Sequence, residues 1–236
     1  MRSRQFIKET VTYSNINDAS EEEQLAAVTT KLGMIKGIDN PSEAVQLAAV
    51  TADPRSIIAI YNPTERVKMV AIENSPDLIK HIPDPSEELQ FAAVLQNYRL
   101  IQHIFNPTPA VQRYVVEERP DLIRLIYDPL EEVQLLAVSA DPWNIQNIWN
   151  PTTAVQKLAV AQNALTIFEI RCDIDPAIFK DIKVKGSIMR GIMRAAESSW
   201  KDRINRYINL LKYYDVDWPD LSIMQRSVDL LPDDDD

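Results

Sequence analysis

Hydrophobic residues recur along this chain with a period of 22 residues. Two columns of isoleucine, three positions apart, run unchanged through seven consecutive units. The first column holds Ile35, Ile57, Ile79, Ile101, Ile123, Ile145 and Ile167, and the second holds Ile38, Ile60, Ile82, Ile104, Ile126, Ile148 and Ile170. A proline after asparagine or aspartate repeats at the same interval, from Asn40-Pro41 to Asn150-Pro151. A fixed period of this length predicts a repeat architecture, with units that begin at Ser20, Ser42, Thr64, Ser86, Thr108, Leu130 and Thr152.

Each unit predicts two short helices. In the second unit, the segment from Val45 to Val50 has apolar residues at i, i+3 and i+4, which is typical of one face of a helix. The second helix of that unit has its two isoleucines on one face and spans only about two turns. Because so short a helix is not stable alone, we expect the units to stack on one another.

Capping residues indicate where these helices begin. We interpret Asn40 and its equivalents as the N-cap of the first helix, with Pro41 as its first residue and Glu43 as its third. The second helices are expected to open in the same way at Asp53-Pro54 and Asp141-Pro142, and more loosely at Ser75-Pro76 and Arg119-Pro120.

The combined pattern resembles a known class of short repeats. Asn/Asp-Pro-Ser/Thr-Glu-x-Val-Gln-Leu-Ala-Ala-Val, followed by Pro-x-x-Ile-x-x-Ile, is similar to the leucine-rich-variant repeats and related two-helix repeats of bacterial and phage proteins, which are relatives of HEAT repeats. The resemblance covers about residues 20–173. It implies a binding surface rather than a particular activity, and in leucine-rich-variant repeats the second helix is often a 3₁₀-helix.

We therefore predict an all-α fold, a right-handed α-solenoid of seven 22-residue two-helix repeats with helical caps at both ends. Residues 1–19 do not fit the repeat and are expected to form the N-terminal cap. The solenoid covers 20–173, a C-terminal helical cap covers 174–231, and 232–236 is an acidic tail. In the C-terminal cap, apolar packing against the last repeat is expected from Ile188, Ile192, Ile204, Ile208 and Leu211.

The amino-acid composition disfavours several kinds of functional site. The chain has 236 residues, a net charge of -10, one cysteine, two histidines and only four glycines. These numbers disfavour a disulfide framework, a cysteine-based zinc site and a phosphate-binding loop. We predict no catalytic residue, no metal and no cofactor, and hence no enzyme. The opening residues lack a signal peptide and no apolar run is long enough for a membrane span, so we expect a cytoplasmic protein, or a virion component if the chain is phage-encoded.

Two columns of variable residues are the candidate contact surface. The fourteenth position of the units holds Arg55, Asp77, Arg99, Asp121 and Trp143. The twentieth position is aromatic in four units, as Tyr61, Phe105, Tyr127 and Trp149. These rings could anchor a partner, although packing of each ring over the following proline is the outcome that we favour, since exposed aromatic patches are uncommon. The partner-binding residues that we predict are Arg55, Tyr61, Arg99, Phe105, Tyr127, Trp143 and Trp149.

Three further features have structural explanations that we prefer. Acidic residues concentrate at helix starts, where they complement the helix dipole, but they could also form an acidic edge. Glutamine recurs at the fifth position, with Lys68 as the exception, and is expected to bond carbonyls between units; a column that contacts a ligand is the alternative. His81 and His103, in one column of adjacent units, are expected to lie on the surface rather than to hold a metal.

The function we expect is a non-enzymatic protein–protein interaction scaffold or adaptor, in a virion or in host takeover if the chain is phage-encoded. The alternative is an acidic inhibitor that mimics nucleic acid and blocks a host nucleic-acid-binding or defence protein. Direct nucleic-acid binding through the basic stretch from Lys180 to Lys212 is a weaker possibility, since the chain as a whole is acidic.

Overall fold

The computed structural model describes residues 15–197, 201–216, 218 and 226, and these residues form only helices, turns and loops. The chain divides into two compact units, Met1–Val111 and Gln112–Asp236. The division falls inside one helix, α6 (Pro109–Glu118). Of the predicted terminal segments, residues 1–14 and 232–236 lie outside the described part of the chain.

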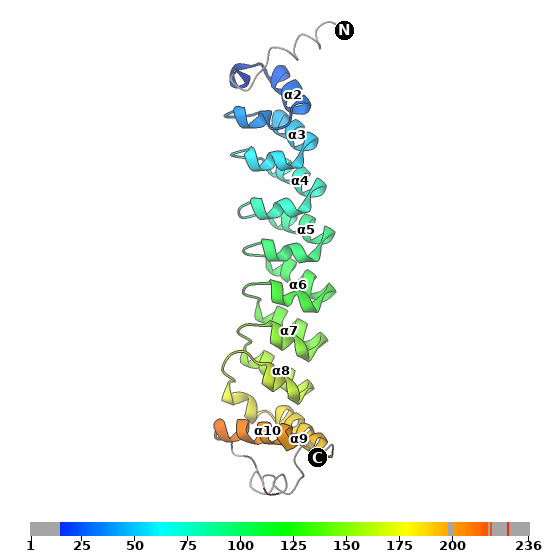
Figure 1. Cartoon of the computed structure of the whole chain (residues 1–236), viewed down its shortest axis with the longest axis vertical. Coiled ribbons are helices and arrows are strands. Elements are labelled where there is room, and N and C mark those ends of the chain that lie inside the picture. Colours follow the sequence, from blue (N-terminus) through cyan, green and yellow to red (C-terminus); the bar gives the residue numbers. More distant parts are fainter. Residues whose placement is uncertain (1–14, 198–200, 217, 219–225, 227–236) are drawn as a thin grey trace. The chain divides into compact units, whose positions relative to one another are not determined.

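Both units repeat one motif, a ten-residue α-helix followed by a 3₁₀-helix of up to six residues. The first unit contains η1 (Ile16–Asp18), α2 (Glu21–Thr30), η2 (Met34–Gly37), α3 (Glu43–Ala52), η3 (Pro54–Ala59), α4 (Glu65–Asn74), η4 (Pro76–His81), α5 (Glu87–Gln96) and η5 (Tyr98–His103). The second unit contains η6 (Pro120–Leu125), α7 (Glu131–Ala140), η7 (Pro142–Asn147), α8 (Thr153–Gln162), η8 (Ala164–Glu169), η9 (Pro176–Lys180), α9 (Ile182–Glu197) and α10 (Lys201–Tyr213). Within each unit, successive α-helices pack side by side in chain order (Figure 1). The predicted all-α repeat is confirmed, and the handedness of its coil stays a prediction.

The core of each repeat comes from the predicted columns. In α7, η7 and the residue that follows η7, the core positions Val133, Ala137, Val138, Ile145 and Ile148 are at most 1% exposed. The isoleucine column also begins one repeat earlier than the seven units, because Ile16 stands 22 residues before Ile38 and is fully buried. Residues 15–19 thus follow the register of the repeat and continue its apolar column into the N-terminal segment.

The helix starts differ from the sequence interpretation in one respect. The N-cap of α3 is Ser42, whose hydroxyl accepts from the N–H of Val45, and Asn40-Pro41 lies before the helix. Thr64, Ser86 and Thr152 cap their helices in the same way. The prediction that asparagine or aspartate caps the first helix is therefore wrong. Asparagine and serine are both good N-caps, so the short motif alone does not decide between them.

The 3₁₀-helices begin as predicted. Asp53 and Asp141 cap η3 and η7 through their carboxylates, and proline occupies the first helical position of both. Ser75 and Arg119 occupy the N-cap positions of η4 and η6 without a capping side-chain hydrogen bond, in keeping with the looser openings expected there.

Buried glutamines at the fifth position connect α3, α5, α7 and α8 to the start of the next repeat, whereas α4 has Lys68 at this position. Gln134 Nε2 donates to the carbonyl of Pro129 (2.9 Å), and Gln134 Oε1 accepts from the N–H of Thr152 (3.3 Å). Gln46, Gln90 and Gln156 make the same pair of bonds in their own repeats. The expected structural role of the glutamine column is therefore confirmed.

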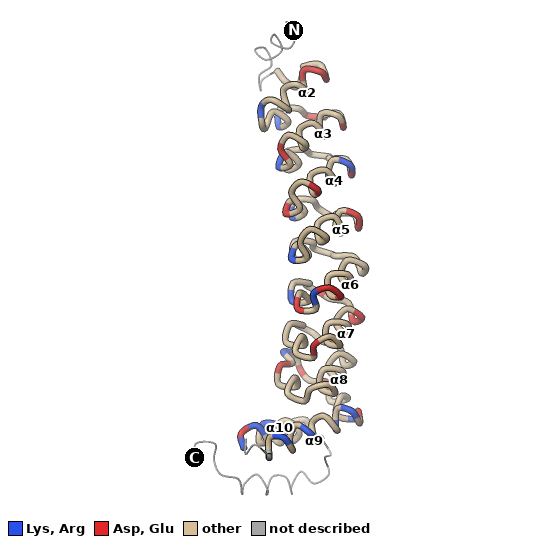
Figure 2. Tube along the Cα trace, turned by 90° about the vertical axis from the view of Figure 1, so that its right-hand side faces the viewer, with Lys and Arg blue, Asp and Glu red and all other residues tan. Residues whose placement is uncertain are grey.

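The first glutamate of an α-helix makes a second bond between repeats. Glu43 accepts from the hydroxyl of Thr64 (2.7 Å), and Glu131 accepts from the hydroxyl of Thr152 (2.6 Å). Each hydroxyl thus caps its own helix and also contacts the preceding repeat. As Figure 2 shows, acidic residues lie in the first turns of α2, α5 and α7.

The last repeat is covered by α9 and α10. All five apolar residues predicted for this cap are at most 5% exposed. Tyr207 of α10 is also fully buried, with its ring centroid 4.9 Å from that of Phe168. Gly191 of α9 makes room for it, because a Cβ at that position would lie 2.9 Å from the Tyr207 hydroxyl oxygen. That hydroxyl has no hydrogen-bond partner among the described residues.

Candidate functional site

The aromatic residues of the twentieth position project from the turns that follow the 3₁₀-helices. The exposed fractions are 96% for Tyr61, 83% for Phe105, 91% for Tyr127 and 79% for Trp149. Rings this exposed do not seal the turn over the following proline, so the packing that the sequence analysis favoured is wrong. The preceding isoleucine ends the 3₁₀-helix in extended backbone, as Ile148 does. Because neighbouring side chains of an extended segment point in opposite directions, the buried isoleucine sends the aromatic residue outward.

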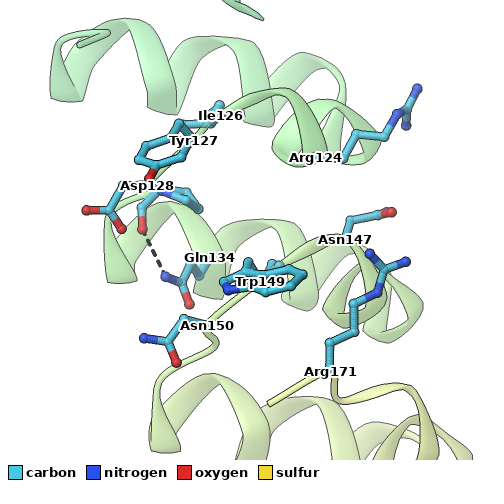
Figure 3. A pocket seen from close by; sticks show the side chains of 11 residues that line it. Arg124, Ile126, Tyr127, Asp128, Gln134, Asn147, Trp149, Asn150 and Arg171 are labelled. Carbon is cyan, nitrogen blue, oxygen red and sulfur yellow. Dashed lines mark hydrogen bonds between the residues drawn. The ribbon is translucent and has the colours of Figure 1, made fainter. Parts of the chain in front are cut away.

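Two of these rings line one open groove in the second unit. The groove has a volume of about 830 Å³ and runs between the turns after η6 and η7. Tyr127 comes from the first turn and Trp149 from the second, and both project from the ribbon into the same opening (Figure 3). Pro129 and the buried Ile126 and Ile148 complete its apolar lining. The repeat thus places one aromatic wall on each of two consecutive turns.

Polar groups also line this groove, some of them bonded to other residues and some without a partner among the described residues. Gln134 is engaged by the backbone, as described above, and Arg124 holds Asp121 through a 2.8 Å ion pair. Arg171 is exposed and forms no ion pair with any described residue. The side chain of Asn150 and the indole N–H of Trp149 likewise have no hydrogen-bond partner in the described part of the chain. These three groups can therefore contact a ligand without first breaking an internal bond.

The first unit has a related groove with weaker aromatic walls. It is lined by Phe105 and Asn106 on one turn, and Pro83 stands where the preceding turn would present its ring. His81 and His103 both line it and both are exposed, as expected for surface residues. Among the described residues, no cluster of three or more histidine, cysteine, aspartate or glutamate side chains could hold a metal ion.

The structure separates the fourteenth-position residues from the aromatic column. Arg55, Arg99 and Trp143 stand near the start of their 3₁₀-helices, and none of them lines the groove that holds Tyr127 and Trp149. Arg55 lines a different groove, with Leu32 and Ile58. In the second unit, Trp143 therefore lies outside the groove that Tyr127 and Trp149 line, and in the first unit Arg55 lies outside the groove that Phe105 lines.

The acidic residues of the fourteenth position are already paired. Asp77 contacts Lys80 at 3.5 Å and accepts from the Ser75 hydroxyl at 2.9 Å, and the serine bond holds the pKa of Asp77 below its usual value. Asp121 pairs with Arg124 in the same i,i+3 arrangement. These contacts leave Asp77 and Asp121 as weaker candidates for a partner than the rings are.

Sequence reasoning did not place Asn150, Arg124 and Arg171 in the candidate site. For Arg171 a signal existed, since it occupies the twentieth position of the last repeat, where four of the other six units have an aromatic residue. Extending the aromatic column by one repeat would have found it. Asn150 was interpreted as a helix N-cap, so its side-chain amide was not considered available to a ligand.

Comparison of the chain with protein-family models, with characterised proteins and with solved structures gives no match. Among the described residues, no helix is both long enough and apolar enough to cross a membrane. The case for a function therefore rests on the repeat and on the groove.

Proposed function

We propose that this protein is a non-enzymatic scaffold that binds another protein through the groove between Tyr127 and Trp149. The observation that carries the proposal is the exposure of two large rings, at 91% and 79%, on consecutive turns of one groove. Large aromatic side chains dominate the binding energy of protein interfaces because they bury much apolar area with few rotatable bonds. Rings that the fold leaves in water are free to supply that energy to a partner.

The repeat class supports the same reading. The two-helix units of 22 residues resemble leucine-rich-variant repeats, and the second helix of every unit is a 3₁₀-helix, as is often the case in those repeats. Stacked repeats offer extended surfaces for partners, and the resemblance therefore agrees with a scaffold or adaptor, in a virion or in host takeover if the chain is phage-encoded.

The nucleic-acid-mimic alternative is less favoured by the contacts. Glu43 and Glu131 are held by hydroxyls of the next repeat, and Glu23 completes a capping box with Ser20. Acidic groups used in this way stabilise the helices and the stack. No comparable internal bond accounts for the exposed rings.

A peptide-display selection tests the proposal. Full-length protein is immobilised and used to select from a library of random 16-residue peptides, in parallel with Tyr127→Ala/Trp149→Ala and with the control Ile182→Ala, which removes an apolar side chain 84% exposed outside the groove. We expect wild type and control to enrich the same peptides and the double variant to bind them at least about tenfold more weakly, because interface hot spots are each worth about 2 kcal/mol or more. Equal binding by the double variant, or no enrichment by wild type, would contradict the proposal.

A further inference from the structure

The spacing of the two aromatic walls restricts the shape of a ligand that could contact both. Each repeat contributes one wall, and helices packed in a stack lie about 8–10 Å apart. A polyproline II helix has three residues per turn and rises about 3.1 Å per residue, so the same face returns about every 9 Å. In a β-strand, side chains on the same face are about 6.6–6.8 Å apart. This spacing is shorter than the about 8–10 Å between repeats, so a strand matches the two rings less well.

The uncommitted polar groups of the groove favour the same conformation over an α-helix. An α-helix also presents side chains about 10 Å apart, at i and i+7, but its carbonyls are bonded internally. A polyproline II segment has no internal hydrogen bonds, so its carbonyls can accept from the Asn150 amide and from the Trp149 indole N–H. Flat aromatic walls with nearby donors are the arrangement that recognises proline-rich segments.

Charge in the groove indicates what accompanies the prolines. Arg171 lies at the end of the groove nearer to the last repeat and has no ion pair among the described residues, whereas Arg124 is held by Asp121. Asp128 lies beside Tyr127 at the other end and disfavours an acidic group there. An extended ligand is therefore expected to carry its acidic residue at the Arg171 end.

The same charges weigh against a nucleic-acid strand. A single strand could stack its bases on both rings, but it carries one phosphate per nucleotide and needs a cationic track along its backbone. Among the described residues that line this groove, Arg171 is the one cation without an ion pair, Asp128 lies at the opposite end, and the chain has a net charge of -10. A peptide with one or a few acidic residues fits this distribution better.

From these observations we infer that the groove between Tyr127 and Trp149 binds a proline-rich segment of a partner protein in the polyproline II conformation, with an acidic residue on Arg171. The inference rests on the proposed function and specifies the class of partner. Prolines of the segment stack on the two rings, and the carboxylate makes a charge-assisted bond with the guanidinium.

Fluorescence polarisation with labelled synthetic peptides and the full-length protein tests this inference. The probe is a 12-residue peptide of Pro-Pro-Glu repeats. Matched probes replace each proline with alanine, or each glutamate with glutamine, and a 12-nucleotide oligothymidine represents nucleic acid. We expect the Pro-Pro-Glu peptide to bind at least about tenfold more tightly than the alanine peptide. Tyr127→Ala/Trp149→Ala should weaken its binding at least about tenfold, and Ile182→Ala should leave it unchanged.

Arg171→Gln separates the charge contact from the stacking contact. We expect this variant to bind the glutamate peptide about fivefold more weakly than wild type does, and the glutamine peptide less than twofold more weakly. Preference for the alanine peptide, or tighter ring-dependent binding of oligothymidine, would overturn the inference. If the display selection succeeds but enriches amphipathic helical sequences in place of proline-rich ones, the scaffold function stands and this inference fails.

Discussion

Replacing Gln134 with leucine is expected to lower the free energy of unfolding by about 2–4 kcal/mol. The Gln134 side chain is 5% exposed and satisfies two backbone groups at once, the carbonyl of Pro129 and the N–H of Thr152. Leucine has a similar size, so the variant creates little cavity. It removes the partners of both backbone groups, and a buried group left without a partner costs about 1–3 kcal/mol.

Urea unfolding followed by far-ultraviolet circular dichroism measures this loss. The matched control is Gln162→Leu, because Gln162 is exposed at the end of α8 and its substitution should change stability by less than about 0.5 kcal/mol. If Gln134→Leu were as stable as the control, the glutamine contacts would not be what joins one repeat to the next.

Raising the pH from 10 to 12 is expected to remove about 2 kcal/mol of stability through Tyr207 alone. Burial raises the pKa of the Tyr207 phenol to about 12, although the nearby charges of Arg203 and Arg206 act in the opposite direction. The unfolded chain has a tyrosine pKa of about 10. Because the folded state binds this proton more tightly, its contribution is complete below pH 10 and is lost as the pH rises through 12.

Tyr207→Phe isolates this contribution. The variant cannot ionise at position 207, so its stability should fall less steeply between pH 10 and pH 12 than that of wild type. At pH 7 it should be at least as stable as wild type, since the Tyr207 hydroxyl is buried without a partner among the described residues. Tyr213→Phe, at a site that is 80% exposed, is the control and should keep the wild-type slope. Identical slopes for Tyr207→Phe and wild type would contradict the assignment.

The core could be predicted from the sequence because its period is strict. Every unit has a pair of isoleucines three positions apart. Ile145 and Ile148 are one such pair, and both are buried because each repeat packs the same face on its neighbours. The residues at which the helices begin were harder to predict from the sequence. In Asn40-Pro41-Ser42-Glu43, two residues could cap the helix, and the choice of Ser42 is accompanied by a contact 21 residues away, from the Ser42 hydroxyl to the Glu21 carboxylate.

The candidate site was predicted only in part for a similar reason. The aromatic column is visible in the sequence, but its exposure depends on which of two adjacent apolar residues, such as Ile126 and Tyr127, turns inward at the end of the 3₁₀-helix. Their exposed fractions of 6% and 91% settle this in the folded chain. The free state of Arg171 depends on what surrounds it in space, and no local motif reports that.

We propose that Tyr127 and Trp149 serve binding and contribute little to the fold. The most direct test is the unfolding free energy of Tyr127→Ala/Trp149→Ala, measured in urea by circular dichroism beside wild type. Because both rings are largely in water, we expect the two free energies of unfolding to differ by less than about 0.5 kcal/mol. A loss of about 2 kcal/mol or more, the range for buried aromatic side chains, would show that the rings are part of the packed structure and would rule out a role in binding alone.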